Sequence, residues 1–172
     1  IVVEAAHVST DAGRVAVLLA LLDSNAAAAG SVLRVPQDYP TIQVAIDAAA
    51  GGDTVVVSPG AYVEQIDFNG KEITVESTDG PGSTIIDGNL AGTVVTILAG
   101  EGQRPVLRGF TIRNGYNFPD AGGIFAYGGP ALIEGNRVTG NFGCSGGGIE
   151  ASFSSATIRD NVVSENRPNC TG

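Results

Sequence analysis

The sequence predicts an all-β protein whose chain winds into a coil of parallel strands, a parallel β-helix of about five turns with one α-helix at its N-terminal end. Three observations predict this fold class. Short β-branched segments alternate with Gly, Pro, Asn and Asp turns, only one segment has a helical period, and the second half of the chain repeats about every 25 residues. A solenoid of stacked turns satisfies all three.

The first thirty residues differ from the rest, and we predict a secretory signal peptide there or, as the alternative, a short apolar helix packed on the end of the domain. Arg14 precedes an apolar run at 15–22, and small residues follow at 26–30. Glu4 and Asp11 argue against a signal peptide, because its first part is normally basic. The apolar run is too short to span a membrane as a helix, which needs about 20 residues.

Residues 41–50 are predicted to form the single helix of the domain. Thr41 is a suitable N-cap and Gly51 follows the last turn. The apolar residues follow the i, i+3, i+4, i+7 spacing of one helix face, at Ile42, Ala45, Ile46 and Ala49. We expect this helix to cover the N-terminal end of the coil. Short strands are predicted after it, at 54–58, 61–66, 72–76, 83–86 and 93–98.

The repeat lies in the second half of the chain. Segment 107–112 aligns with 133–138 and with 158–163, at offsets of 26 and 25 residues, and the Gly-Gly-Ile sequence at 122–124 recurs at 147–149. In a coil of parallel strands about 4.8 Å apart, equivalent positions lie directly above one another. The aligned aliphatic residues are therefore expected to form stacks inside the coil.

Two polar columns follow from the same alignment. Asn136 and Asn161 are expected to stack at a bend, where their side chains bond each other and the turn backbone. The outward positions Arg108, Glu134 and Arg159 alternate in charge and are expected to form ion pairs between turns. Exposed pairs of this kind contribute only about 0–1 kcal/mol each.

The two cysteines are 26 residues apart, which is one turn of the predicted coil. Each follows an equivalent asparagine by three or four positions, so Cys144 and Cys170 would lie about 5 Å apart, a separation that suits a disulfide bond. Two unpaired thiols are the alternative. Two cysteines without a nearby histidine do not form a zinc site, and we assign no metal site.

Aromatic residues in the Gly-Gly-Ile strand are the candidates for binding. Side chains alternate along a strand, so Phe125 and Tyr127 point outward when Ile124 points inward. The 25-residue offset places Glu150 and Ser152 of the next turn beside them. Sugar rings stack on such aromatic faces, although these rings can also simply cover the coil beneath long loops. The candidate carbohydrate-binding residues are Tyr116, Phe118, Phe125, Tyr127, Glu150 and Ser152.

The chain resembles the right-handed parallel β-helices of the pectate lyase and pectin methylesterase superfamily over roughly residues 32–170. The resemblance is carried by segments such as Tyr39-Pro40-Thr41-Ile42-Gln43, Pro59-Gly60-Ala61-Tyr62 and Gly146-Gly147-Gly148-Ile149. It implies a right-handed coil and a secreted bacterial type of protein. Counterparts of two esterase catalytic segments are missing, as is an acidic cluster like the calcium site of the lyases. We therefore assign no catalytic residue and no cofactor, although relatives of this kind use calcium.

Composition limits the partners. The chain of 172 residues has a net charge of −9 and a single lysine, which argues against binding nucleic acid.

We predict a β-helix domain at 31–172, truncated at its C-terminus because residue 172 falls where another turn should begin. The predicted function is a secreted or cell-surface module without catalytic activity that binds a polysaccharide or cell-surface glycan. The alternatives are a polysaccharide-active enzyme, lyase or esterase, and a filament subunit that associates head to tail through its C-terminal edge.

Overall fold

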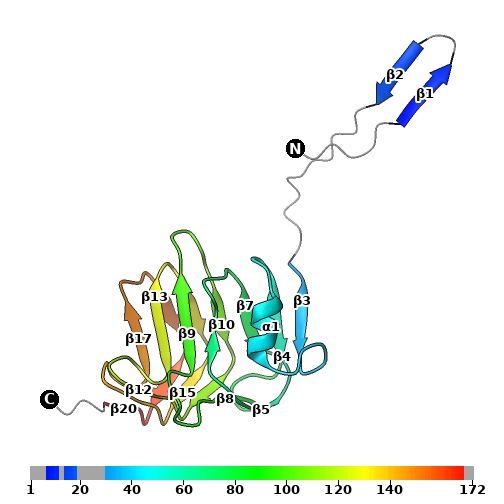
Figure 1. The fold of residues 1–172 in the computed structure, drawn as a ribbon. Helices are drawn as coiled ribbons and strands as arrows, with labels where there is room; N and C mark the ends of the chain where they lie inside the picture. The colour runs from blue at the N-terminus through cyan, green and yellow to red at the C-terminus, as the bar shows by residue number, and fades with distance from the viewer. Residues whose placement is uncertain (1–6, 12–13, 19–29, 169–172) are drawn as a thin grey trace.

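The computed structural model describes residues 7–11, 14–18 and 30–168 (Figure 1). Strands β1 (His7–Asp11) and β2 (Arg14–Leu18) pair antiparallel and belong to no other sheet. The rest of the segment predicted as a signal peptide or apolar helix lies outside the described residues. So does Cys170, and the Cys144–Cys170 disulfide therefore stays a prediction.

Residues 30–168 form the predicted right-handed parallel β-helix of about five turns. The chain visits the parallel sheets in the same order in each turn, with the third sheet entering only in the later turns. The first sheet contains β3 (Val32–Val35), β4 (Thr54–Val57), β7 (Thr74–Ser77), β10 (Val106–Arg108), β14 (Leu132–Glu134) and β18 (Thr157–Arg159). The second contains β5 (Gly60–Val63), β8 (Thr84–Asp87), β11 (Thr111–Arg113), β15 (Arg137–Thr139) and β19 (Val162–Ser164).

The fourth sheet closes the turns, and the third sheet lies before it in the later turns only (Figure 1). The third is built from the two-residue strands β12 (Tyr116–Asn117), β16 (Phe142–Gly143) and β20 (Arg167–Pro168). The fourth contains β6 (Ile66–Asp67), β9 (Val95–Ala99), β13 (Ile124–Gly128) and β17 (Ile149–Ser152). Because all four sheets are parallel and in register, each strand residue of one turn lies beside the equivalent residue of the next turn.

The inner stacks confirm the predicted alignment. Leu107 lies beside Ile133, which in turn lies beside Ile158. The same column continues into the first half of the chain through Val75 and Val55, both fully buried. Those two residues are 20 positions apart, and Val75 is 32 positions from Leu107, so the sequence shows no constant period there. The inner stack continues unchanged because the extra residues lie in loops outside it.

The bends between the first and second sheets use one residue with a left-handed backbone in each of the three later turns. That residue is Gly109, then Gly135, then Asp160, with φ of 83°, 64° and 56°. It is followed by a side chain that turns inward, Phe110 in one turn and Asn136 in the next, both buried. A positive φ costs glycine little, which explains why glycine recurs at this bend.

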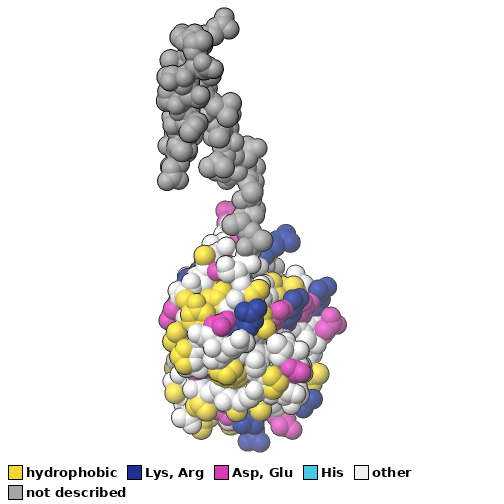
Figure 2. Space-filling view, turned by 90° about the vertical axis from the view of Figure 1, so that its right-hand side faces the viewer, with side chains coloured by type: hydrophobic (Ala, Val, Ile, Leu, Met, Phe, Trp, Pro, Cys, Tyr) yellow, Lys and Arg dark blue, Asp and Glu magenta, His cyan; other side chains and the backbone are white. Residues whose placement is uncertain are grey.

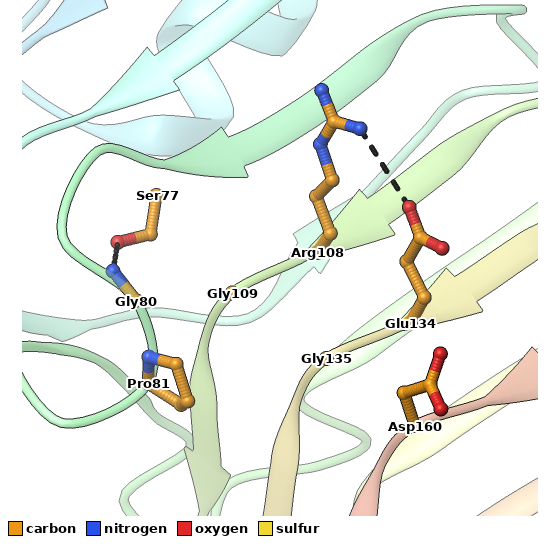
Figure 3. A pocket seen from close by; sticks show the side chains of 8 residues that line it. All are labelled: Ser77, Gly80, Pro81, Arg108, Gly109, Glu134, Gly135 and Asp160. Atoms are coloured by element: carbon orange, nitrogen blue, oxygen red, sulfur yellow. Dashed lines mark hydrogen bonds and ion pairs between the residues drawn. The ribbon is translucent and has the colours of Figure 1, made fainter.

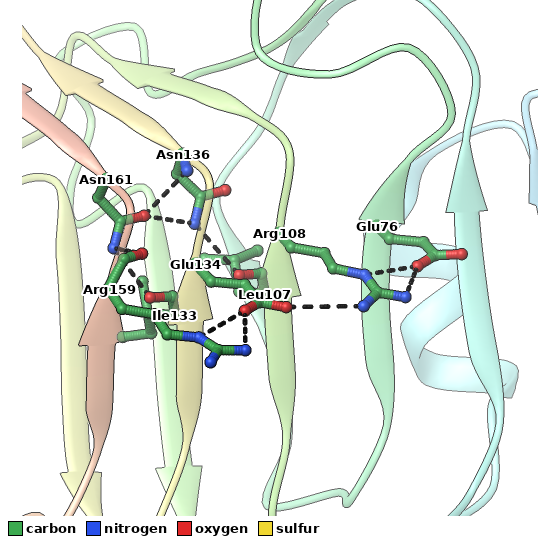
Figure 4. Close-up of polar contacts among 8 residues, drawn as sticks. All are labelled: Glu76, Leu107, Arg108, Ile133, Glu134, Asn136, Arg159 and Asn161. Atoms are coloured by element: carbon green, nitrogen blue, oxygen red, sulfur yellow. Dashed lines mark hydrogen bonds and ion pairs between the residues drawn. The ribbon is translucent and has the colours of Figure 1, made fainter.

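The predicted asparagine stack is present at this bend (Figure 4). Asn136 Oδ1 accepts a hydrogen bond from the Phe110 N–H at 3.0 Å, and Asn161 Oδ1 accepts one from the Asn136 N–H at 2.9 Å. A second stack lies between the second and third sheets, where Asn141 and Asn166 accept from backbone N–H groups in the same way. The two stacks satisfy buried backbone donors that no strand pairs, which a buried turn requires.

Helix α1 (Ile42–Ala48) lies at the N-terminal end of the coil, as predicted (Figure 1). Thr41 is its N-cap, and its side chain accepts a hydrogen bond from the Val44 N–H. Ile42 and Ile46 are fully buried on the side that faces β3, β4 and β6. Figure 2 looks onto this capped end of the coil, where acidic and basic side chains are interspersed with small hydrophobic areas.

Candidate functional site

The outer surface of the fourth sheet carries four of the six predicted candidates in the predicted register. Phe125 lies beside Glu150, and Tyr127 lies beside Ser152, because β13 and β17 pair in parallel. The buried residues Ile124 and Ala126 point to the inside of the coil and thereby turn Phe125 and Tyr127 outward. On the other side of β13, Leu98 of β9 lies beside Tyr127 and is exposed as well.

Three aromatic rings form a continuous row on this surface. The Phe125 and Tyr127 rings stack with centroids 6.3 Å apart, and the Tyr127 and Phe153 rings meet edge to face at 5.9 Å. Tyr127 is half exposed, whereas Phe153 is 88% exposed. We call Phe125, Tyr127 and Phe153 the aromatic face. The sequence pattern does not predict Phe153, because this residue follows the strand and breaks the alternation that points to the other two.

The backbone at Phe153 is unusual for its residue type. Phe153 has a φ of 48°, in the left-handed region, and Gly128 occupies the equivalent position one turn earlier with a φ of 91°. A bulky side chain in this region costs about 1–3 kcal/mol. Burial does not offset that cost, since the ring is almost wholly exposed. Phe153 lies on the last described turn, where the inner-stack residues Ile158 and Val163 are exposed as well, so its exposure follows in part from its place at the end of the described coil.

The other predicted site residues have different positions. Glu150 is half buried, and its Oε2 accepts a hydrogen bond from the Ala121 N–H at 3.1 Å, so it holds the loop before β13. Tyr116 lies in strand β12 of the third sheet, where it pairs with Phe142 of β16. Phe118 is exposed in the loop between the third and fourth sheets. The structure thus joins Phe125 and Tyr127 with Glu150 and Ser152, and it places Tyr116 in another sheet.

A surface pocket of about 430 Å³ adjoins the aromatic face through Phe153. Three successive turns contribute to it, each with the bend that follows the fourth sheet. Its lining residues are Ala99, Glu101, Gly102, Gly128, Gly129, Pro130, Phe153 and Ser155. We call it the Glu101 pocket. It continues the aromatic face toward the first sheet, so one extended ligand can contact both.

A second pocket, of about 400 Å³, lies at the bend between the first and second sheets (Figure 3). We call it the corner pocket. Charged side chains line it, but they bind each other: Glu134 Oε1 lies 3.6 Å from Arg108, and its Oε2 accepts a hydrogen bond from Arg159 at 2.8 Å. Both carboxylate oxygens of Glu134 are thus engaged by the fold. Asp160, also in this pocket, is exposed.

The ion pairs in the corner pocket belong to the predicted charged column (Figure 4). The column includes one residue that the sequence alignment missed, Glu76, whose Oε2 accepts a hydrogen bond from Arg108 Nε at 2.7 Å. Hydrogen bonding to Glu76 raises the pKa of Arg108, and the charges of Glu76 and Glu134 act in the same direction, against the smaller effect of burial. These contacts indicate a role in joining successive turns rather than in binding a ligand.

The described residues contain no group of three or more His, Cys, Asp or Glu side chains that could hold a metal ion. In the same part of the chain, no helix is long and apolar enough to cross a membrane.

The comparison with protein families decides the identity of the fold. A model of the right-handed β-helix region matches residues 65–172, more than half of the chain. The chain belongs to the right-handed β-helix family. No curated protein and no solved structure matches it. The comparisons therefore support the β-helix repeat, and the narrower resemblance of this β-helix protein to pectate lyases and pectin methylesterases stays a prediction.

Proposed function

We propose that this β-helix protein is an extracellular module without catalytic activity that binds glycans through its aromatic face. The continuous row of the Phe125, Tyr127 and Phe153 rings is the observation that carries the proposal, with successive centroids 6.3 and 5.9 Å apart. Sugar rings stack their C–H faces on aromatic side chains, and Tyr127 adds a phenolic hydroxyl group that can hydrogen-bond a sugar. A row of three rings suits an oligosaccharide better than a single sugar.

The rigidity of the coil supports the same proposal. Phe125 and Tyr127 project from β13, which is paired on both sides by β9 and β17. Side chains on a strand that is held on both sides lose little freedom when a ligand binds, and this preserves affinity. Exposed apolar groups gathered on one surface of a secreted protein are typical of a binding site.

The proposal is tested by titrating the protein with a panel of neutral oligosaccharides in isothermal calorimetry. We expect binding, with the affinity falling about tenfold in each of the variants Tyr127→Ala and Phe153→Ala, since stacking on one ring contributes about 1–1.5 kcal/mol. The matched control is Val63→Ala, which removes an exposed apolar side chain from the second sheet. Its affinity should equal that of the unchanged protein.

Two results would overturn the proposal. One is the absence of binding to every oligosaccharide of the panel, and the other is equal affinity of all variants. Incubation with pectin, polygalacturonate and alginate, with and without calcium, tests the hypothesis of a lyase or esterase. Unsaturated products or released methanol would show that the protein is an enzyme and would contradict the proposal of a module without catalytic activity. Light scattering over a wide range of concentration tests the predicted self-association.

A further inference from the structure

The Glu101 pocket has a charge pattern that bears on which glycan is bound. Glu101 is the one acidic residue of its described lining, and Phe153 is the one aromatic residue. Among the residues that the structure describes, neither Lys nor Arg lines the pocket. Glu150, which lies beside Phe125, is a second acidic residue on the fourth sheet. The whole chain has a net charge of −9, which favours the approach of cations.

The carboxylate of Glu101 is available to a ligand. Glu101 is exposed in the turn after β9, and within the described part of the chain its side chain has no hydrogen bond or ion pair. This distinguishes it from Glu134 in the corner pocket and from Glu150, whose oxygens bond other parts of the protein. The Glu101 pocket is therefore the described pocket in which a carboxylate and an exposed aromatic ring are both free to contact a ligand.

The backbone of the pocket is held in place by close stacking of its turns. Gly128 and Gly129 line the floor, and a Cβ atom on either residue would lie only 2.3 or 2.2 Å from a backbone oxygen of the preceding turn. The Gly129 N–H donates a hydrogen bond to the Ala99 oxygen at 2.7 Å. On the following turn, Ser154 Oγ donates a hydrogen bond to the Gly129 oxygen at 3.1 Å. The walls that carry Glu101 and Phe153 are thus built on stacked backbone.

A free carboxylate and an exposed aromatic ring that line one pocket are suited to a positively charged group. The face of an aromatic ring attracts an ammonium ion, and a nearby carboxylate adds direct charge attraction. A uronate or sulfated sugar would instead meet repulsion from Glu101, with no basic group on the described lining to compensate. The combination of a ring for stacking and a carboxylate for an amine therefore selects among glycans by charge.

We propose that the Glu101 pocket binds the protonated amino group of an amino sugar, while a neighbouring sugar ring of the same chain stacks on the aromatic face. The inference rests on the proposed glycan binding and specifies its ligand class: oligosaccharides that contain unacetylated glucosamine or a similar amine. Such a ligand carries a protonated amine that Glu101 can pair with and sugar rings that can stack on the aromatic face.

The test compares two oligosaccharides of the same length by calorimetry at low salt and slightly acidic pH, one of glucosamine and one of N-acetylglucosamine. They share a backbone and differ in the charge of the amino group. We expect the glucosamine oligomer to bind about tenfold more tightly, since one cation–π contact with an added ion pair supplies about that factor. This preference should shrink at high ionic strength and at a pH where the amine is neutral.

Two variants locate the effect. Glu101→Gln removes the carboxylate and should abolish the preference for the glucosamine oligomer, while the weaker binding of the acetylated oligomer remains. The matched control is Asp160→Asn, which removes an exposed carboxylate from the corner pocket and should leave the preference unchanged. Circular dichroism and the denaturation midpoint of each variant show whether the fold is intact.

The outcomes separate this inference from the proposed function. If both oligomers bind equally, and Tyr127→Ala weakens both, glycan binding stands and the amino-sugar preference is overturned. The preference is also overturned if Glu101→Gln retains it or if Asp160→Asn removes it. If neither oligomer nor any member of the neutral panel binds, the proposed function fails and the ligand class fails with it.

Discussion

Glu64 and Lys71 bind the two ends of helix α1 from either side of strand β6. The Glu64 carboxylate accepts hydrogen bonds from the N–H groups of Ile42 and Gln43 at 3.1 and 2.9 Å. The Lys71 ammonium group donates to three carbonyl oxygens at the other end, those of Ile46, Asp47 and Ala49, at 2.8, 2.8 and 2.9 Å. A negative charge at the start of a helix and a positive charge at its end are the favourable arrangement. The only lysine of the chain therefore fastens the helix to the coil.

We expect Lys71→Met to destabilise the protein by about 2 kcal/mol, because three helix carbonyl groups lose a charged donor. Urea denaturation followed by circular dichroism measures the change. Arg34→Met is the control: Arg34 forms an exposed ion pair with Asp38 at 3.5 Å, and its loss should cost less than about 0.5 kcal/mol. Equal costs for the two variants would contradict the role of Lys71.

Asn136→Ala should cost about 3 kcal/mol, because it leaves both the Phe110 N–H and the Leu107 carbonyl without a partner inside the coil. Asn136 is only 1% exposed, so water cannot readily replace these bonds. Denaturant unfolding measures the effect as a shift of the midpoint, while the dependence of the unfolding free energy on denaturant concentration stays unchanged. Ser164→Ala, at an exposed position in β19, serves as the control and should change stability by less than about 0.5 kcal/mol. A cost for Asn136→Ala as small as that of the control would count against the asparagine stack.

Arg108→Gln should cost about 1 kcal/mol at low salt, since Arg108 pairs with both Glu76 and Glu134 across three turns. Most of that cost should disappear in about 1 M salt, where the screening length falls to about 3 Å. Thermal denaturation at the two salt concentrations measures it. Arg137→Gln, which changes an exposed arginine of β15, is the control. A cost that is independent of salt would show that Arg108 acts through packing of its side chain.

The carboxyl group of Asp87 should make stability depend on pH in the acid range. Burial alone would raise the pKa of Asp87, but hydrogen bonds from Asn114, Asn89 and Arg113, with the Arg113 charge, together lower it below its usual value of 3.8. A group whose pKa is lower in the folded state stabilises the fold at pH values above its unfolded pKa. This contribution is lost as the pH falls through the folded value.

Asp87→Asn should therefore destabilise the protein at pH 7 and do so progressively less below about pH 4. Urea denaturation at a series of pH values measures the difference between the variant and the unchanged protein. Asp160→Asn is the control, since no hydrogen bond to the exposed Asp160 carboxylate is present in the described structure. A difference for Asp87→Asn that grows as the pH falls would contradict the lowered pKa.

The second half of the coil is predictable from the sequence because its turns have nearly constant length. Leu107, Ile133 and Ile158 recur at offsets of 26 and 25, and the same offset predicts that Phe125 lies beside Glu150, which the pairing of β13 with β17 confirms. In the first half, the loops between strands differ in length, so Val55 and Val75 carry no visible period. Loops outside the stack can change length without disturbing it. The coil therefore continues through the first half of the chain although the sequence period is lost there.

The sequence by itself determined the fold class, the capping helix, the register of the later turns and two of the three rings of the aromatic face. Only the tertiary structure revealed Phe153 as the third ring, Glu101 as an acidic residue of the pocket that Phe153 also lines, and Lys71 as the group that holds α1. These three residues lie just outside the regular strands and helix, where alternation and helical periodicity make no prediction. Their partners come from other turns of the coil, so their roles depend on how the turns stack.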